Sequence, residues 1–433
     1  MRQSTPSLLA WAIHGRVTVR SAVLGPVHLL LLLLTLVLLA GCGGNAGEAA
    51  FTRFVAVIDA GSSGSRLVLY ERIRDGQGIK VEQRLTDTGG QALSSFESNP
   101  QQAGPAGVQP LIDKLQQALK TLNTPNSAVE LHLLATAGMR LVEARNPAAA
   151  KAIYESARSV ISASGLKPGR IETLSGTDEG LFAWLDLNDL AGHFRNGTPP
   201  ALGIVEVGGA SAQIAFATTE DYRPGVSVSV QGKTYRVFSQ SWLGLGQDQA
   251  RLSMIRLHQR QTTADDAGNP CYANNTSQIG GLTAFDAGIE GVFIALGDFN
   301  FQACQSLYDA VLSPFGVGAV VAVPGFDNVS LVGVSSVNFA LQDWQASAAP
   351  GMLAVQLQAR CTGPDAYGAQ VLPYLGRNPP GNRFAQNACA NGTYAHALLF
   401  GPQGLKLRPA QLQSESAAGV SVNWTRGVAL AGT

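Results

Sequence analysis

Two segments of the chain repeat one local pattern, and this repeat limits the folds that the chain can adopt. Residues 55–70 read "VAVIDAGSSGSRLVLY" and residues 203–217 read "GIVEVGGASAQIAFA". In both, a β-favouring run ends in an acid, Asp59 or Glu206, and a glycine-rich tip leads into a second β-favouring run, which is typical of a β-hairpin. The acids lie 147 residues apart. This domain-sized spacing predicts two related domains, each of which contributes one hairpin tip to a cleft between them.

The rest of the N-terminal half alternates between strand-like and helix-like patterns. An apolar run at 129–138 predicts a strand, and helical patterns follow at about 146–164 and from Ser175 onward. Strands that alternate with helices indicate an α/β fold. A chain of 433 residues with 45% hydrophobic content is long enough to build two domains with cores of their own.

The first fifty residues do not fit this folded part. Residues 29–42 read "LLLLLLTLVLLAGC" and follow several basic residues, which is typical of a signal peptide and short for a membrane span. The end of this run resembles a bacterial lipobox, so we expect cleavage after residue 41 and acylation of Cys42. The alternative is an ordinary signal peptide with a chance cysteine. Residues 42–50 then form a flexible, lipid-anchored tether.

This N-terminus predicts a bacterial cell-envelope protein. Gly43 follows the cysteine, and the lack of an aspartate there favours the outer membrane, or a periplasm-facing site, over retention in the inner membrane. An even number of further cysteines in an exported chain indicates two disulfides. Four cysteines allow three pairings, of which the sequential one closes the shortest loops and is preferred: Cys271–Cys304 and Cys361–Cys389.

The two hairpin tips have the composition of an anion site. Glycine and serine tips point backbone N–H groups outward in a concave arrangement that suits phosphate. The tips contain no lysine, which excludes the lysine-dependent nucleotide loop. Neutralising a polyphosphate therefore requires a divalent cation, which Asp59 and Glu206 are expected to hold through its water shell. The alternative is a pair of ordinary turns with structural acids. The presence of two matched hairpins in one chain favours the phosphate site over this alternative.

One further acid has two possible roles. In "TDEGLFAWL", Glu179 falls in the first turn of the expected helix. A helix dipole favours an acid at that place. The same carboxylate is also placed to act as a general base that takes a proton from water attacking a terminal phosphate.

Five motifs of the chain resemble those of the nucleoside triphosphate diphosphohydrolases, the apyrase or ecto-ATPase family, in order and approximate spacing. They are "VIDAGSSGSRLVLY", "ATAGMRL", "SGTDEGLFAWL", "VEVGGASAQIAF" and "SQSWLGLGQDQARL". The resemblance implies an α/β fold of two ribonuclease-H-like domains of the actin and sugar-kinase superfamily, with an active-site cleft between them. Domain I is then expected over 51–175 plus 415–433, because the family's C-terminal helix returns to the first domain. Domain II is expected over 176–414.

The resemblance also implies a role for each matched residue. Glu179 would be the catalytic base, and Ser211 and Gln213 would position the attacking water. The acids of both hairpins and Thr136 would hold the hydrated metal. The phosphate-binding residues would be Gly61, Ser62, Ser63, Gly64, Ser65 and Arg66 at the first tip, and Gly208, Gly209 and Ala210 at the second.

The chain also departs from the family's pattern. Glu206 replaces a shorter aspartate, and Ala388 stands where the family tends to place a tyrosine against the nucleobase. Phe339 and Phe384 are the candidates for stacking on the base in this chain. For both, the alternative is packing in the hydrophobic core.

The expected reaction is metal-dependent hydrolysis of nucleoside tri- and diphosphates to the monophosphate, with Mg²⁺ or Ca²⁺, by a monomer. Lys+Arg and Asp+Glu are equal at 30 each, so no excess positive charge is present for nucleic-acid binding. The competing interpretations are an exopolyphosphatase-like phosphoanhydride hydrolase, a sugar kinase and a non-catalytic nucleotide-binding surface protein. Exported proteins meet little ATP to use as a donor, which disfavours the kinase.

Overall fold

A computed structural model describes residues 51–76, 78–200, 202–262, 268–283, 290–376 and 383–431. The expected signal peptide over 1–41, the tether over 42–50 and Cys42 lie outside these ranges. Within them, no helix combines the length and the apolar character that crossing a membrane requires. The described residues form one compact unit, so the domain boundaries expected from the sequence stay a prediction.

The first sheet has five strands in the order β3-β2-β1-β4-β5. β1, β2 and β3 form an antiparallel meander, whereas β4 and β5 run parallel to β1. The expected hairpin is present as β1 and β2. The strands are β1 (Phe51–Ala60), β2 (Ser65–Asp75), β3 (Gly78–Gly90), β4 (Val129–Ala135) and β5 (Lys167–Thr173), and the helices are α2 (Gln109–Thr121), α3 (Ala137–Arg145) and α4 (Pro147–Ala163).

The second sheet repeats this order with one strand added. Its order is β13-β12-β6-β7-β9-β8, in which β6, β7 and β9 are antiparallel and β12 and β13 run parallel to β6. β6 and β7 therefore correspond to the hairpin β1–β2, and β12 corresponds to β4. The strands are β6 (Leu202–Val207), β7 (Ser211–Ala217), β8 (Val226–Val230), β9 (Lys233–Leu243), β12 (Ser330–Ser335) and β13 (Leu412–Ser414).

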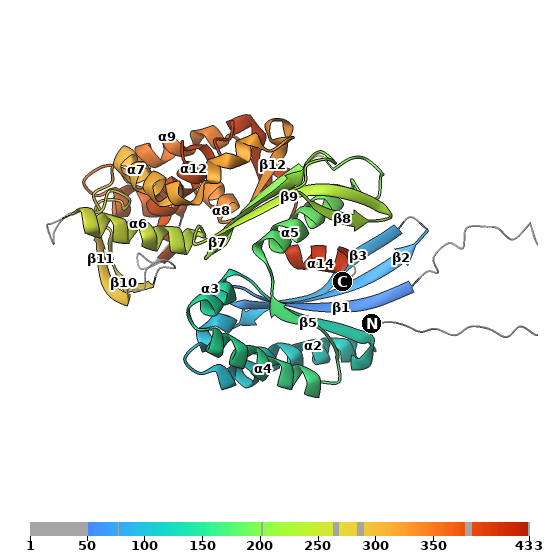
Figure 1. Ribbon diagram of the computed structural model, residues 1–433. Helices are drawn as coiled ribbons and strands as arrows, with labels where there is room; N and C mark the ends of the chain where they lie inside the picture. Colours follow the sequence, from blue (N-terminus) through green and yellow to red (C-terminus); the bar gives the residue numbers. More distant parts are fainter. Residues whose placement is uncertain are drawn as a thin grey trace, which may run out of the picture. The chain divides into compact units, whose positions relative to one another are not determined.

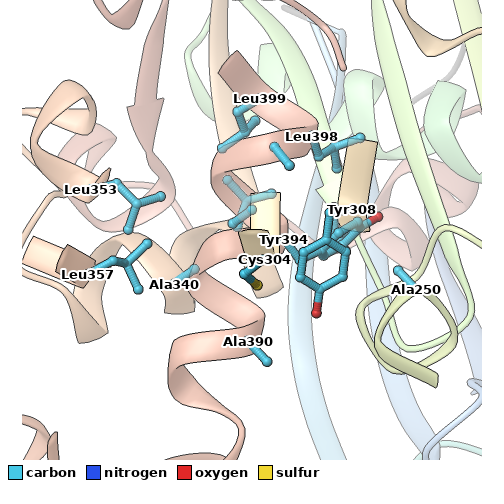
Figure 2. Packing of buried hydrophobic residues seen from close by; sticks show 14 of the residues in the cluster. Ala250, Cys304, Tyr308, Ala340, Leu353, Leu357, Ala390, Tyr394, Leu398 and Leu399 are labelled. Atoms are coloured by element: carbon cyan, nitrogen blue, oxygen red, sulfur yellow. The ribbon is translucent and has the colours of Figure 1, made fainter. Parts of the chain in front are cut away.

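Helices cover the second sheet on the side away from the first (Figure 1). They include α6 (Gln247–Gln261), α7 (Phe301–Leu312), α8 (Ser336–Asp343), α9 (Leu353–Cys361) and α12 (Ala388–Phe400). The short helices α10 (Leu372–Leu375) and α11 (Arg383–Gln386) follow α9 in the chain, and α13 (Glu415–Ala418) packs on β12 and β13. A two-stranded ribbon, β10 (Ser277–Thr283) with β11 (Glu290–Leu296), lies outside both sheets. Figure 2 shows the core beneath these helices, where Tyr394 of α12 lies beside Tyr308 of α7 at 5.3 Å between ring centroids.

Both disulfides lie in this helical part. Cys271 pairs with Cys304 and Cys361 pairs with Cys389, with Cα atoms 4.8 and 6.1 Å apart. The sequential pairing is therefore confirmed. The first bridge joins α7 to the segment before β10, and the second joins α9 to α12. Each closes a loop between cysteines 33 or 28 positions apart, which restricts the unfolded chain and so stabilises the fold.

Two helices lie between the sheets: α5 (Gly176–Leu190) and α14 (Trp424–Ala431). α5 packs on β6, β7 and β9, and α14 packs on α5 and on β1, β2 and β3. Apolar side chains of both helices and both sheets form one shared core. The helices approach closely at Gly427, where a methyl group would come within 2.0 Å of the Phe182 carbonyl oxygen. Only glycine fits that contact.

Polar groups also join α14 to its neighbours. The Tyr70 hydroxyl lies 2.7 Å from the Thr425 hydroxyl. Arg426 donates to Asp186 and Asp189 of α5 at 2.6 Å each and to the carbonyl of Val81 at 3.2 Å. The helix is thus tied to the first sheet and to α5 by polar contacts as well as by packing.

One sequence expectation about local structure is wrong. The run at 129–138 forms a strand only as far as Ala135, and α3 begins at Ala137. The carbonyl of Thr136 accepts hydrogen bonds from the amides of Met139 and Arg140. These helical bonds compete with the sheet for the backbone, so the apolar residues after Thr136 extend the core as a helix.

Candidate active site

The two hairpin tips face a common cleft of about 580 Å³. Residues of the first tip, among them Ser62, and of the second, among them Gly209, line it together. A methyl group added to Gly209 would come within 2.8 Å of the Ser62 hydroxyl. The tips are therefore in contact, and glycine at 209 is what lets them approach this closely.

The second tip is held from behind by the segment that leads into α6. The amide of Gln247 donates to the carbonyl of Gly208 at 2.8 Å, and the amide of Asp248 donates to the carbonyl of Gly209 at 3.0 Å. A methyl group on Gly246 would lie 2.1 Å from the amide nitrogen of Ala210. These contacts fix the carbonyls of the tip, so that its amides keep a defined direction.

Asp59 lies at the end of β1, is 4% exposed, and lines the cleft. Arg66, across the hairpin in β2, donates to its Oδ2 at 3.1 Å. Burial raises the pKa of Asp59 to about 6, against the opposing effect of the Arg66 guanidinium. The ionised carboxylate is thus short of compensating positive charge.

Glu179 lies in the first turn of α5. This helix begins where the Ser175 hydroxyl accepts a hydrogen bond from the amide of Asp178 at 3.1 Å, which is the usual role of a serine N-cap. Glu179 is 7% exposed and lines the cleft. Its Oε2 accepts a hydrogen bond from Gln213 at 3.0 Å and forms an ion pair with Arg140 of α3.

The surroundings give this carboxylate the properties of a base near neutral pH. Burial raises the pKa of Glu179 to about 7 and outweighs the Arg140 cation, which lowers it, while the Asp59 charge raises it further. A general base works best when its pKa lies near the working pH. A solvated acid placed only for the helix dipole would lack this burial.

Glu206 ends β6 in the same way that Asp59 ends β1. It lines the cleft, and its Oε1 accepts a hydrogen bond from the Ser335 hydroxyl at 3.3 Å. Its Oε2 is buried and has no hydrogen-bond partner among the residues that the structure describes. Burial raises the pKa of Glu206 to about 8, and the charges of Glu179 and Asp59 raise it further.

These three carboxylates share one cleft, and they repel one another when they are ionised. A bound cation would remove this repulsion and satisfy the orphaned oxygen of Glu206, so the residues fit a divalent ion. Among the described residues, no three His, Cys, Asp or Glu side chains are grouped to hold a metal directly. Carboxylates can also hold a divalent cation through its water shell, which Mg²⁺ tends to keep.

The structure places the other predicted site residues at different depths. Thr136 lines the cleft beside Asp59. Ser211 and Gln213 of β7 are buried behind Glu179, and the Gln213 amide donates to the Ser211 hydroxyl at 2.6 Å. Six of the nine predicted phosphate-binding residues, Arg66 among them, line the cleft, whereas the side chains of Ser65 and Ala210 are buried. The others that line it are Gly61, Ser62, Ser63, Gly208 and Gly209, and Gly64 lies outside the lining.

The aromatic candidates lie at the cleft and not in the core. Phe339 is 59% exposed and Phe384 is 54% exposed, and both line the cleft with Ala388. The core-packing alternative is therefore wrong for both. Their exposure to the cavity leaves a flat apolar surface available to a ligand.

Sequence reasoning missed two contacts of the site. The sequence motifs gave Arg140 no role, yet it pairs with Glu179 and also contacts the hydroxyls of Ser211 and Ser241. Its position inside "ATAGMRL" was the available signal. The contact of Ser335 with Glu206 joins residues 129 positions apart, and no local pattern indicated it.

Comparisons with known proteins agree with this geometry. The model of the GDA1/CD39 (nucleoside phosphatase) family matches residues 47–346. The chain is 27% identical over 321 residues to ectonucleoside triphosphate diphosphohydrolase 3 of Mus musculus, which covers 63% of this chain. It is 30% identical over 280 residues to probable apyrase 3 of Arabidopsis thaliana, which covers 60% of this chain. The chain spans 60% and 56% of the length of these relatives.

A solved structure supports the fold. The crystal structure of nucleoside triphosphate hydrolases from Neospora caninum superposes with a TM-score of 0.57 at 15% identity, covering 93% of this chain and 96% of that chain. The α/β class, with two ribonuclease-H-like sheets and a cleft between them, is thus confirmed.

Proposed function

The chain belongs to the GDA1/CD39 (nucleoside phosphatase) family, and from this we propose that it hydrolyses nucleoside tri- and diphosphates to the monophosphate and phosphate. One observation carries the proposal. The carboxylates of both hairpins and of α5 face a single cleft between two glycine-rich tips. Phosphate chains, a hydrated cation and an attacking water all need such a site at once.

The tips and the acids have separate roles in this proposal. The backbone amides of 61–65 and 208–210 bind the phosphate oxygens, and Arg66 adds positive charge at the first tip. Asp59, Thr136 and Glu206 hold the water shell of Mg²⁺ or Ca²⁺. The cation, when bound, neutralises phosphate charge and orients the terminal phosphate for in-line attack.

Glu179 takes the proton from the attacking water. Arg140 and Gln213 both hold its Oε2, so we assign Oε1 to the water. Gln213 donates to the Ser211 hydroxyl. Together, Ser211 and Gln213 position the attacking water toward the terminal phosphorus. The phosphoanhydride bond then breaks, and its oxygen leaves with the nucleotide.

A substrate panel tests the proposal against its alternatives. We expect phosphate release from ATP and ADP but not from AMP, with Mg²⁺ or Ca²⁺ present, and loss of release in excess EDTA. Phe339 and Phe384 favour a nucleoside over polyphosphate, because both present exposed rings to the cleft. Equal release in EDTA would contradict the cation role, and polyphosphate as the preferred substrate would support the exopolyphosphatase alternative. Binding without release would support a nucleotide-binding surface protein.

The pH profile should report the base. Glu179 accepts a proton only in its ionised form, so kcat/KM is expected to fall about tenfold per pH unit below its pKa of about 7. The decrease therefore comes on the acid side, where Glu179 becomes protonated. Steady-state rates for ADP at saturating Mg²⁺, measured across neutral pH, provide the test. A profile that stays flat on the acid side would contradict the assignment.

We also propose that the protein is exported and anchored by lipid at Cys42, and that it works as a monomer in the bacterial envelope. "LAGC" at 39–42 supports the anchor, and the two disulfides suit an oxidising compartment. The Cys42→Ala variant is expected to move from the membrane fraction to the soluble fraction on fractionation of expressing cells. A variant that stays wholly in the membrane fraction would indicate an uncleaved anchor instead.

A further inference from the structure

Ser335 occupies the junction between β12 and α8 in a backbone conformation that serine rarely adopts. The strand ends at this residue and the helix begins at the next, so the chain turns within one residue. Its φ is +54° and its ψ is −125°. This is the conformation of the first central residue of a type II′ turn, which glycine normally occupies.

The corresponding junction in the first sheet is relaxed. There, Thr136 separates β4 from α3 and has a φ of −112°. A side chain at the second junction therefore carries a conformational cost that the fold does not require, because glycine would make the same turn without it. Strain of this kind persists where the side chain has a use.

The Ser335 side chain contacts one of the three carboxylates of the cleft. In the parallel register of β12 and β6, Val334 lies opposite Glu206 and Ser335 lies opposite Val207. The Ser335 hydroxyl then donates to Glu206 Oε1 at 3.3 Å, and both residues line the cleft.

Glu206 needs an anchor more than its counterpart does. Asp59 is held by Arg66 across its hairpin. Glu206 has a longer side chain with one more rotatable bond, and the residue opposite it in β7 is the uncharged Gln213. Its other oxygen has no partner among the described residues. The serine hydroxyl is thus the side-chain contact that selects one orientation of this carboxylate.

We propose that Ser335 is a positioning residue that holds Glu206 in the orientation needed to bind the water shell of the divalent cation. The inference rests on the proposed function, since it requires that cation. It adds that the strained junction of the second sheet is kept for cation affinity at the expense of stability. Removing a hydrogen-bonded partner of a metal-binding group typically weakens metal binding by about 10- to 100-fold.

Two substitutions separate affinity from stability. Ser335→Ala removes the hydroxyl and keeps the strain, whereas Ser335→Gly removes both. In the full-length protein, we expect both variants to bind Mg²⁺ about 10-fold more weakly, measured by calorimetric titration in the presence of the non-hydrolysable ATP analogue adenylyl imidodiphosphate. The glycine variant should melt above the alanine variant, because glycine adopts this turn without strain.

Gln345 provides a matched control for the strain. It also has a positive φ, of +49°, at the other end of α8, and it is exposed and outside the cleft lining. Gln345→Gly should raise the melting temperature and leave Mg²⁺ binding unchanged. The comparison shows whether releasing backbone strain in this helix alters cation binding by itself.

The outcomes distinguish the positioning role of Ser335 from the proposed hydrolysis. Wild-type Mg²⁺ affinity in both Ser335 variants would overturn the positioning role and leave the proposed hydrolysis intact. A glycine variant that melts below the alanine variant would also overturn the proposal, because the strain would then be absent. Wild-type protein that binds no Mg²⁺ with the analogue would refute the cation site itself, and with it the proposed function.

Discussion

Glu179→Gln is expected to lower turnover of ADP and ATP by roughly 10² to 10⁴. Glutamine keeps the length and the helical position of the side chain but removes the oxygen that accepts the proton. The amide oxygen can still accept hydrogen bonds from Gln213 and Arg140, so the cleft should keep its shape. Steady-state phosphate release with saturating Mg²⁺ measures the loss.

The neighbouring acid provides the control for this variant. Asp178 lies in the same first turn of α5 and outside the cleft lining. Asp178→Asn removes the same helix-dipole charge, worth about 0.3–1 kcal/mol of stability, and should leave turnover nearly unchanged. Nucleotide with Mg²⁺ should still raise the melting temperature of Glu179→Gln, because binding to the folded state stabilises it. A folded Glu179→Gln protein with wild-type turnover would remove the base assignment.

Arg426→Met is expected to destabilise the protein by about 3–5 kcal/mol. The arginine bridges Asp186, which has no exposed surface, and Asp189, which is 8% exposed. Burial already raises the pKa of Asp186 to about 6, although Arg426 opposes this effect. Without the guanidinium, two buried carboxylates would face each other between α5 and α14. Urea unfolding followed by circular dichroism gives the change in free energy.

A surface ion pair sets the scale for this effect. Lys114 is 46% exposed and pairs with Asp87 at 2.7 Å, so Lys114→Met should cost less than about 1 kcal/mol. Adding Asp186→Asn and Asp189→Asn to Arg426→Met should recover part of the lost stability, because neutral amides tolerate burial better than unpaired charges. Equal, small effects of Arg426→Met and Lys114→Met would show that the buried network contributes little.

The cleft could be predicted because its two halves are local patterns. Each acid is adjacent in sequence to its glycine tip. When the strands pair, the acid and the tip therefore lie together at one edge of the sheet. The repeat then predicted that both tips contribute to one cleft, and in the structure Asp59 and Glu206 both line it. Glu179 could be added because helix starts also have local signals.

The contacts that tune these acids could not be predicted in the same way. Arg140 reaches Glu179 across 39 positions, and Ser335 reaches Glu206 across 129. Such pairs depend on the register between strands and on how helices pack on them, which no local pattern specifies. The exposure of Phe339 and Phe384 depends likewise on which helix face meets solvent, so the sequence left stacking on a base and packing in the core as alternatives for both.

The position of α5 affects how far Glu179 and the two hairpin tips would each move if the sheets rotated. The proposed base, Glu179, is carried by this helix, which packs on the second sheet and, through α14, on the first, whereas the proposed phosphate-binding tips lie at the ends of the sheets. In a rotation, atoms far from the pivot travel farther than atoms close to it. A rotation of one sheet against the other about α5 would therefore displace the two hairpin tips more than it displaces Glu179. In the proposed reaction, the two tips would then adapt to a shorter phosphate chain while Glu179 keeps its place.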